Sequence, residues 1–193
     1  MPDKKTLDLL FTEARTHTHW QDKDVPEALL KQLYDLAKMG PTSANCQPMR
    51  IVFVKSKEQK VVLEPLLVES NRRKMMEAPV CAIVAFDLLF TEHIESLYPK
   101  KGIRAYFEGD PDLQAFEAFR SGTLQGGYFI LAARLLGLDC GPMAGFDKGA
   151  VDQTFFKDER FKTNFLCNLG YGDFSKLHPR NPRLNFNEAC QII

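Results

Sequence analysis

The chain has 193 residues, 45% of them hydrophobic, and its 25 Lys and Arg balance its 25 Asp and Glu to a formal net charge of zero. This length is sufficient for one domain with a substantial core. Zero net charge gives no general attraction to nucleic acid or to an anionic membrane. No apolar run has the length of a membrane span, and the N-terminus lacks the apolar core of a secretory signal. These features predict a cytoplasmic protein without nucleic-acid or membrane partners.

The first half of the chain predicts helices interleaved with two strands. Leucines recur at helical spacing between Val25 and Met39, and Gly40-Pro41 stops that pattern. The predicted elements are a short helix ending near Arg15, a helix over 25–39, a strand over 50–55, helical pieces over 57–67 and 71–78, and a strand over 79–87. Residues 87–110 have no clear period, and we expect an irregular segment that covers a site.

The second half is dominated by a long helical pattern over 112–138. Its middle holds Gly122, Gly126 and Gly127, and glycine inside a helix costs about 1 kcal/mol relative to alanine. We therefore expect a compensating close approach, to another helix or to a ligand. After it we expect a helix over 148–156, a strand over 163–173 and a Pro-rich arm over 178–193. Strands interrupted irregularly by helices favour a single α+β domain over residues 1–193.

The five cysteines are scattered and form no CxxC or Cys/His spacing. This arrangement favours reduced thiols over a disulfide framework or a zinc site. Cys81, Cys140 and Cys167 lie in apolar stretches, and we expect them in the core. The four histidines have no ligand partners at useful spacing, so no metal is expected.

The usual signatures of independent catalytic chemistry are missing. The sequence has no GxGxxG, GxxxxGK[ST], HExxH or GxSxG motif. Polar, glycine-containing loops without an acid–base constellation are suited to a cofactor that carries the reaction. Arg15, Lys74 and Arg183 belong to separate cationic patches, which would form a phosphate pocket if folding brings them together.

One loop, GPTSANCQP at 40–48, has more hydrogen-bonding side chains than a turn needs. It resembles the loop of the FMN-dependent nitroreductase family, whose pattern is roughly (A/S)PSSxNxQPW before a strand. Further segments follow the order of that family: Arg-Thr at 15–16, Asn-x-x-Lys at 71–74, GPMAGFD at 141–147 and Arg-Leu at 183–184. The resemblance covers roughly residues 12–193.

The resemblance narrows, on stretches such as LGLDCGPMAGFD and NLGYGDFSKL, to the malonic semialdehyde reductases (3-hydroxypropionate dehydrogenases) of bacterial uracil degradation, a pyrimidine-degradation pathway. It implies a central, mainly antiparallel sheet flanked by helices, and a homodimer that exchanges C-terminal arms. The implied reaction uses NADH or NADPH and FMN to reduce malonic semialdehyde to 3-hydroxypropionate. Two alternatives stay open: a broad nitroaromatic, quinone or enone reductase of the same family, and a flavin-binding module without turnover.

The resemblance also implies flavin contacts for individual residues, with the flavin at the subunit interface. Its phosphate is implied to meet Arg15, Thr16, the backbone near His17 and Thr18, and Arg183. The ring is implied to meet Asn71, Lys74, Met143, Ala144 and Gly145, with Ser121 as a further contact, and the other subunit to cover it with Pro41, Thr42, Ser43 and Asn45. A positive charge from Lys74 near the ring's N1 and O2 would favour the anionic reduced flavin.

Some positions depart from the pattern of that family. Thr18 and Asn181 stand where cations are common, Ala144 stands where an acid is common, and Met49 replaces a tryptophan. Because fewer cations would meet the phosphate, the sequence does not determine the affinity for FMN. The carboxylate of the implied substrate requires a cation, and the candidates are Arg120, Arg104 and the pair Lys100 and Lys101.

Overall fold

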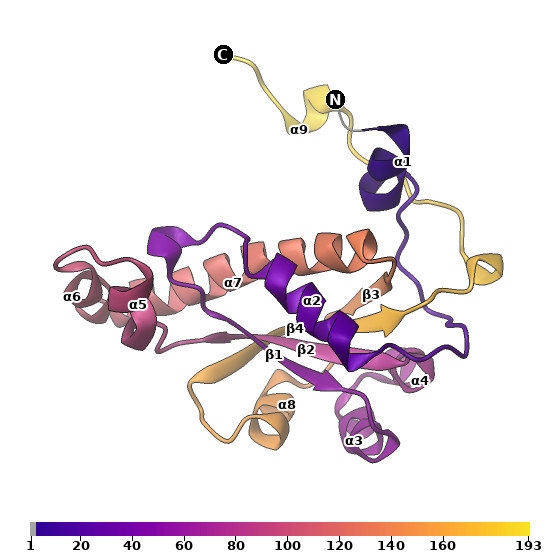
Figure 1. Ribbon diagram of the computed structural model, residues 1–193, viewed down its shortest axis with the longest axis horizontal. Helices are drawn as coiled ribbons and strands as arrows, with labels where there is room; N and C mark the ends of the chain where they lie inside the picture. The colour runs from indigo at the N-terminus through magenta and orange to yellow at the C-terminus, as the bar shows by residue number, and fades with distance from the viewer. Residues whose placement is uncertain (1–2) are drawn as a thin grey trace.

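The computed structural model describes residues 3–193, which fold around one four-stranded antiparallel sheet of order β1-β2-β4-β3 (Figure 1). The strands are β1 (Met49–Val54), β2 (Val80–Asp87), β3 (Asp139–Met143) and β4 (Phe161–Gly170). β1 and β4 pair with the two edges of β2, which is almost entirely buried. The expected α+β fold with an antiparallel central sheet is confirmed.

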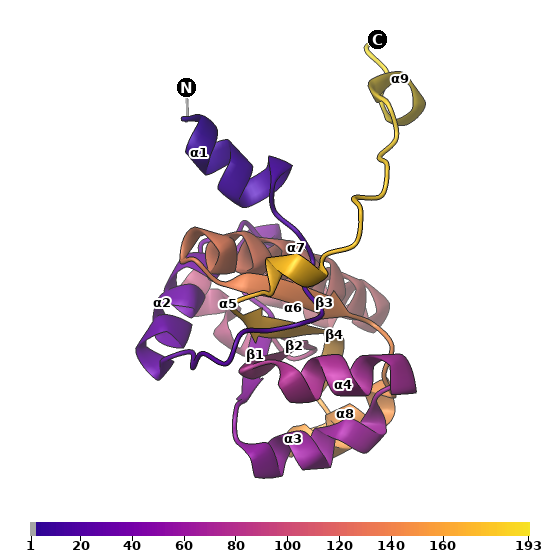
Figure 2. The same cartoon turned by 90° about the vertical axis from the view of Figure 1, so that its right-hand side faces the viewer.

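Helices cover the sheet on both faces (Figures 1 and 2). One face carries α2 (Glu27–Ala37) and α7 (Pro111–Leu135), and the other carries α3 (Lys57–Leu63), α4 (Glu69–Glu77) and α8 (Lys148–Phe155). Because side chains alternate along a strand, Val80, Ala82 and Val84 of β2 enter the first core, whereas Cys81 and Ile83 enter the second. These helices lie close to their predicted bounds.

The segment 87–110, for which the sequence predicts irregular structure, contains two helices, and that prediction is wrong. α5 spans Thr91–Leu97 and α6 spans Ile103–Glu108. Each has at most two turns, which is too short for a helical repeat of apolar residues to be recognisable in the sequence. Their order comes instead from a third apolar cluster, in which Phe90, Ile94 and Phe107 pack against Cys46 and Ala118.

β3 is a second element that the sequence does not predict. Its middle residues, Gly141 and Pro142, both disfavour strands. β3 pairs with β4 on one side and makes only an isolated bridge on the other, between Thr16 and Cys140. Proline lacks an N–H, and an edge strand tolerates that loss because one side of its ladder needs no donor.

The glycines of α7 have two different environments. A Cβ on Gly126 would lie 2.6 Å from Phe165 Cε1, and one on Gly122 would lie 3.0 Å from Phe86 Cβ. Both glycines therefore let α7 approach the sheet closely. The sequence analysis expected the close approach to be to another helix or to a ligand. A Cβ on Gly127 would meet no neighbouring atom of residues 3–193 within 4 Å.

The two ends of the chain project from the body on the same side (Figures 1 and 2). The N-terminal helix consists of α1 (Lys4–Leu7) and a π-helical turn (Asp8–Thr12), and ends three residues before the predicted Arg15. The C-terminal arm includes α9 (Phe186–Ala189). Its apolar side chains are exposed, with Leu184 at 71% and Ile192 at 86%.

Cys81, Cys140 and Cys167 are each 0% exposed, which confirms their predicted place in the core. Between residues 3 and 193, no helix combines the length and the hydropathy needed to cross a bilayer. The same residues contain no group of three or more His, Cys, Asp or Glu placed to hold a metal ion.

Candidate active site

One group of expected flavin contacts meets where α4 faces the end of β3. Asn71 Nδ2 donates a hydrogen bond to Gly145 O at 3.1 Å, and the backbone N–H of Val68 donates to the same carbonyl at 3.1 Å. Lys74 Nζ donates to Asn71 Oδ1 at 3.2 Å. The structure thus brings Asn71, Lys74 and Gly145 together from segments about seventy residues apart.

The backbone of Lys74 is held by two side chains that the sequence analysis did not single out. Its carbonyl is among the last four of α4, which lack partners within the helix, and it accepts from Trp20 Nε1 at 3.2 Å and Asn168 Nδ2 at 3.0 Å. Asn168 Nδ2 also lies 3.7 Å from Met143 Sδ. In the sequence, Asn168 could have been recognised as a polar residue within the apolar stretch NFLCNLG.

This corner contains unused hydrogen-bonding groups. Within residues 3–193, the Gly145 N–H donates no hydrogen bond, and the buried Oδ1 of Asn168 accepts none. A Cβ on Gly145 would lie 2.7 Å from Val68 Cγ2 and 2.8 Å from Asn71 Nδ2. Only glycine permits this approach, so the Gly145 backbone stays accessible beside Asn71 and Lys74. A free N–H, an amide and an ammonium fit the polar edge of a flavin ring.

The motif at 15–18 runs beside β3. Thr16 forms a parallel bridge with Cys140, and the His17 N–H donates to Cys140 O at 3.0 Å. Arg15 donates to the carbonyl of His178, at the root of the arm. Thr18 Oγ1 lies 3.2 Å from His19 Nδ1.

The His17 side chain is part of the core. Its imidazole is fully buried, stacks edge-on against Phe174 with 4.8 Å between centroids, and has Nε2 3.4 Å from Asp139 Oδ1. A Cβ on Gly172 would lie 1.9 Å from His17 Nδ1, so a glycine is required there. Burial lowers the pKa of His17, against the opposing effect of the Asp139 charge. His17 therefore pairs its backbone with β3 and packs its ring in the core.

The second group of expected contacts lies in the 40–48 loop. Three non-glycine residues of this loop have left-handed backbones, with φ of 47° at Ala44, 50° at Asn45 and 47° at Gln47. Such residues persist only where their surroundings fix them. The Ser43 N–H donates to Ser121 Oγ on α7 at 3.2 Å, and Asn45 Nδ2 donates to Leu97 O on α5 at 2.8 Å.

Polar groups of the loop therefore already have partners in the same chain. Thr42 Oγ1 accepts from the Gln47 N–H at 3.3 Å, and Gln125 of α7 donates from Nε2 to Gln47 Oε1 at 2.7 Å. Gln125 Oε1 accepts from the Met49 N–H at 3.0 Å. Some of the polar side chains that are frequent in this loop therefore serve to shape it. Pro41, at the start of the loop, lines an open cleft beside α2 and β1.

The remaining predicted residues are not joined to either group. Arg183 Nη1 bonds to Asn181 O at 2.9 Å within the arm. Arg120 pairs with Glu117 one turn earlier on α7, and Arg104 Nε pairs with Glu108 Oε1 at 2.8 Å on α6. Arg15, Lys74 and Arg183 consequently do not form one phosphate pocket through any hydrogen bond between them among the described residues.

The two groups lie at opposite ends of the sheet. Figure 1 shows α4 near one end and the loop leading into β1 near α5 and α6 at the other. One chain therefore divides the expected flavin contacts between two separate places.

The fold and the α4 corner define a class of α+β protein with a site suited to a planar, polar-edged cofactor. The model of the Nitroreductase family matches residues 12–171. A protein of Ralstonia nicotianae, provisionally named NADH dehydrogenase/NAD(P)H nitroreductase, is 51% identical over 99% of this chain and 98% of its own. This chain belongs to the nitroreductase family.

Solved structures share the fold at low sequence identity. A provisionally named nitroreductase from Exiguobacterium sibiricum, in complex with FMN, superposes with a TM-score of 0.87 at 18% identity, over 100% of this chain and 99% of its own. CLA-ER, an enone reductase of gut-bacterial fatty acid saturation, superposes with a TM-score of 0.82 at 16% identity over both full chains. At these identities the likeness establishes the fold alone.

Proposed function

We propose that this protein is an FMN-dependent NAD(P)H oxidoreductase that works as a homodimer, with each flavin bound between two subunits. The observation that carries the proposal is the separation of the two groups of site residues. Neither end of the sheet provides a complete site, whereas a second copy could place its 40–48 loop against the α4 corner. The relatives' NAD(P)H names and the FMN of a solved family member agree with this class and these cofactors.

Within the site, the chain supplies binding and electrostatics. FMN held there would supply hydride transfer between NAD(P)H and the acceptor. Lys74 offers a positive charge to the polar edge of the ring, and Asn71 offers an amide. The two side chains are hydrogen-bonded to each other within α4. Gly145 offers its free N–H. Arg15, Thr16, Thr18 and, from the arm, Arg183 would hold the phosphate.

Exposed apolar surface supports the dimer. A groove of about 540 Å³ on α7 is lined by Phe116, Phe119, Leu124 and Tyr128, and apolar residues continue along the arm. Contiguous apolar patches of this kind mark protein–protein contacts. Exchange of arms would cover both and bring Arg183 to the partner subunit. Light scattering that shows a monomer at micromolar concentration would contradict this assembly.

The acceptor that we propose is malonic semialdehyde, reduced to 3-hydroxypropionate in the cytoplasm as part of pyrimidine degradation. Its carboxylate needs a cation, and Arg120 adjoins Ser121, which touches the loop. Arg120 is paired with the largely buried Glu117, and Arg104 with the exposed Glu108. Each arginine would therefore have to bind the substrate carboxylate while it remains paired with its glutamate. The alternative is a broad nitroaromatic, quinone or enone reductase, which the relatives' nitroreductase names favour.

The test of the enzyme class is an absorption spectrum of purified protein with FMN, recorded under nitrogen before and after NADPH. A bound flavin that bleaches with NADPH supports the proposal, and a protein that neither binds FMN nor oxidises NADPH refutes it. FMN that binds without turnover would indicate a non-catalytic module. Lys74→Ala is expected to lose flavin or slow its reduction, whereas Arg73→Ala, an exposed neighbour paired with Glu77, should leave both unchanged.

The acceptor is tested by recolouring the reduced protein. Malonic semialdehyde that reoxidises the flavin with a higher kcat/KM than a nitroarene or a quinone supports the finer proposal. Arg120→Ala should then raise the KM for the semialdehyde about tenfold or more, the factor for a lost interaction of roughly 1.4 kcal/mol. The uncharged quinone should be unaffected. Equal effects on both acceptors would remove Arg120 as the carboxylate contact.

A further inference from the structure

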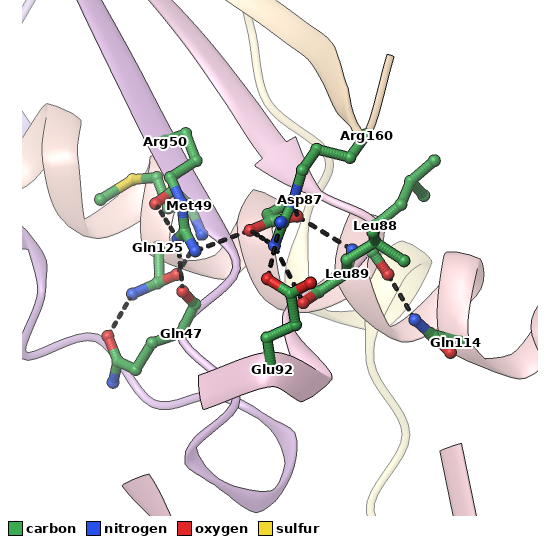
Figure 3. A network of polar contacts seen from close by, with 10 residues as sticks. All are labelled: Gln47, Met49, Arg50, Asp87, Leu88, Leu89, Glu92, Gln114, Gln125 and Arg160. Atoms are coloured by element: carbon green, nitrogen blue, oxygen red, sulfur yellow. Dashed lines mark hydrogen bonds and ion pairs between the residues drawn. The ribbon is translucent and has the colours of Figure 1, made fainter. Parts of the chain in front are cut away.

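An ion network at the end of β2 joins the 40–48 loop to α5 (Figure 3). Its centre is Asp87, the last residue of β2, whose side chain is 1% exposed. Its carboxylate accepts from Arg50 Nη2 at 2.8 Å, from Arg160 Nε at 2.7 Å and from Arg160 Nη2 at 2.9 Å. The Leu89 N–H adds a fourth bond, at 2.9 Å. A buried carboxylate is stable only with such partners.

On one side the network holds the loop. Arg50 Nη1 donates to the carbonyls of Gln47 and Met49, both at 3.0 Å. The backbone N–H of Asp87 donates to Pro48 O at 2.9 Å. The network therefore fixes three consecutive carbonyls where the loop enters β1, beside the left-handed Gln47.

On the other side the network holds the start of α5. Arg160 Nη1 donates to Glu92 Oε2 at 2.6 Å, and Arg160 Nη2 donates to Leu89 O at 3.1 Å. Glu92 is in the first turn of α5. At the far end of this helix, Leu97 O accepts from Asn45 of the loop. α5 and the loop are thus connected at both ends of the helix.

The network is cooperative by its chemistry. Its two arginines and two carboxylates cancel in charge, and Arg160 is only 14% exposed. Removal of one member leaves an uncompensated charge beside a buried one, which costs more than the lost contact alone. A change on either side therefore alters the partners of Asp87, which contacts the other side as well.

We propose that Arg50, Asp87, Arg160 and Glu92 are positioning residues that hold the 40–48 loop and α5 as one unit, which shapes the part of the site that the loop supplies. None of them is assigned a contact with flavin or substrate. The structural part of this inference concerns the chain itself, and its catalytic part rests on the function proposed above.

The first test is hydrogen exchange on the full-length protein with Arg50→Lys and Glu92→Gln. Arg50→Lys keeps the charge but loses the planar fork that reaches both carbonyls and Asp87. Glu92→Gln keeps the shape and removes the charge. Each variant should speed amide exchange on both sides, in residues 42–48 and in 91–97. Effects confined to the side of the substitution would overturn the proposal. Val151→Ala, a buried change in α8, controls for general loss of stability.

The second test is steady-state kinetics with saturating FMN and NADPH. Each variant should raise the KM for the acceptor several-fold with little change in kcat, and the double variant should be no worse than the poorer single variant, because both break one unit. Additive effects, or an equal rise of KM in Val151→Ala, would overturn the proposal. If the unaltered protein does not oxidise NADPH, the proposed function fails, and hydrogen exchange alone decides whether the unit exists.

Discussion

The two ends of the sheet are built in different ways. At the α4 end, the Asn71 side chain bonds to the Gly145 carbonyl, and Trp20 and Asn168 bond to the Lys74 carbonyl, all through neutral donors. At the loop end, left-handed residues are tied by an ion network and by a small apolar cluster of their own. The α4 end adjoins the main cores, whereas the loop end packs on the smaller third cluster.

This difference suggests a division of labour. A cofactor is retained through every turnover, so its contacts benefit from a rigid surround. Acceptors enter and leave, and the segments that admit them are drawn from the less stable parts of a fold. We expect the α4 end to determine which cofactor binds and the loop end to determine which acceptor reacts.

The largest effect should come from removing one aromatic side chain from the main core and one from the cluster at the loop end. Phe129→Ala, in the core between α7 and the sheet, should lower the free energy of unfolding by about 3–5 kcal/mol. Phe107→Ala removes an equally buried ring from the third cluster, where it packs 5.2 Å from Phe90. We expect it to lower global stability less and to open α5 and α6 locally, as hydrogen exchange would show. An identical loss of melting temperature and exchange protection in both variants would mean that the loop end is not separable from the main core.

An intermediate effect is expected from the glycines of α7. Gly126→Ala forces a Cβ against Phe165, and overpacking of this kind costs about 1–3 kcal/mol. Gly127→Ala has free space in the chain and should stabilise the helix by roughly 0.5–1 kcal/mol. Chemical denaturation measures both. A destabilising Gly127→Ala that also weakens self-association would place the partner subunit against this position.

A smaller effect concerns pH and the buried His17. Because burial lowers its pKa, the unfolded chain binds more protons than the folded one below the ordinary value near 6.5. Stability contributed by the neutral ring is therefore complete above that pH and is lost as the pH falls from it to the lower pKa of the folded state. The slope of unfolding free energy between pH 7 and pH 5 should be flatter in His17→Asn. An unchanged slope would assign the acid sensitivity to other groups.

The sequence predicts the long elements and the site motifs at both ends, and it misses the short elements, for physical reasons. β2, β4 and the long helices have apolar runs or periods long enough to recognise, and the resemblance marks Asn71, Lys74 and Gly145 at one end and the 40–48 loop at the other. β3 is hidden by Gly141 and Pro142, and α5 and α6 are too short to show a period. The pairs that Asp87 forms with Arg50 and Arg160 join residues 37 and 73 positions apart, and no local pattern encodes such pairs.

The separation of the two groups of site residues has a genetic consequence. In the proposed homodimer, each site takes its α4 corner from one chain and its loop from the other. A Lys74→Ala chain and a chain defective in its loop would each be inactive alone. In a mixed dimer the two defects fall in the same site, which leaves the other site entirely intact. Co-expression of two inactive alleles should therefore restore one of the two sites in every mixed dimer, which is half the activity of an unaltered dimer.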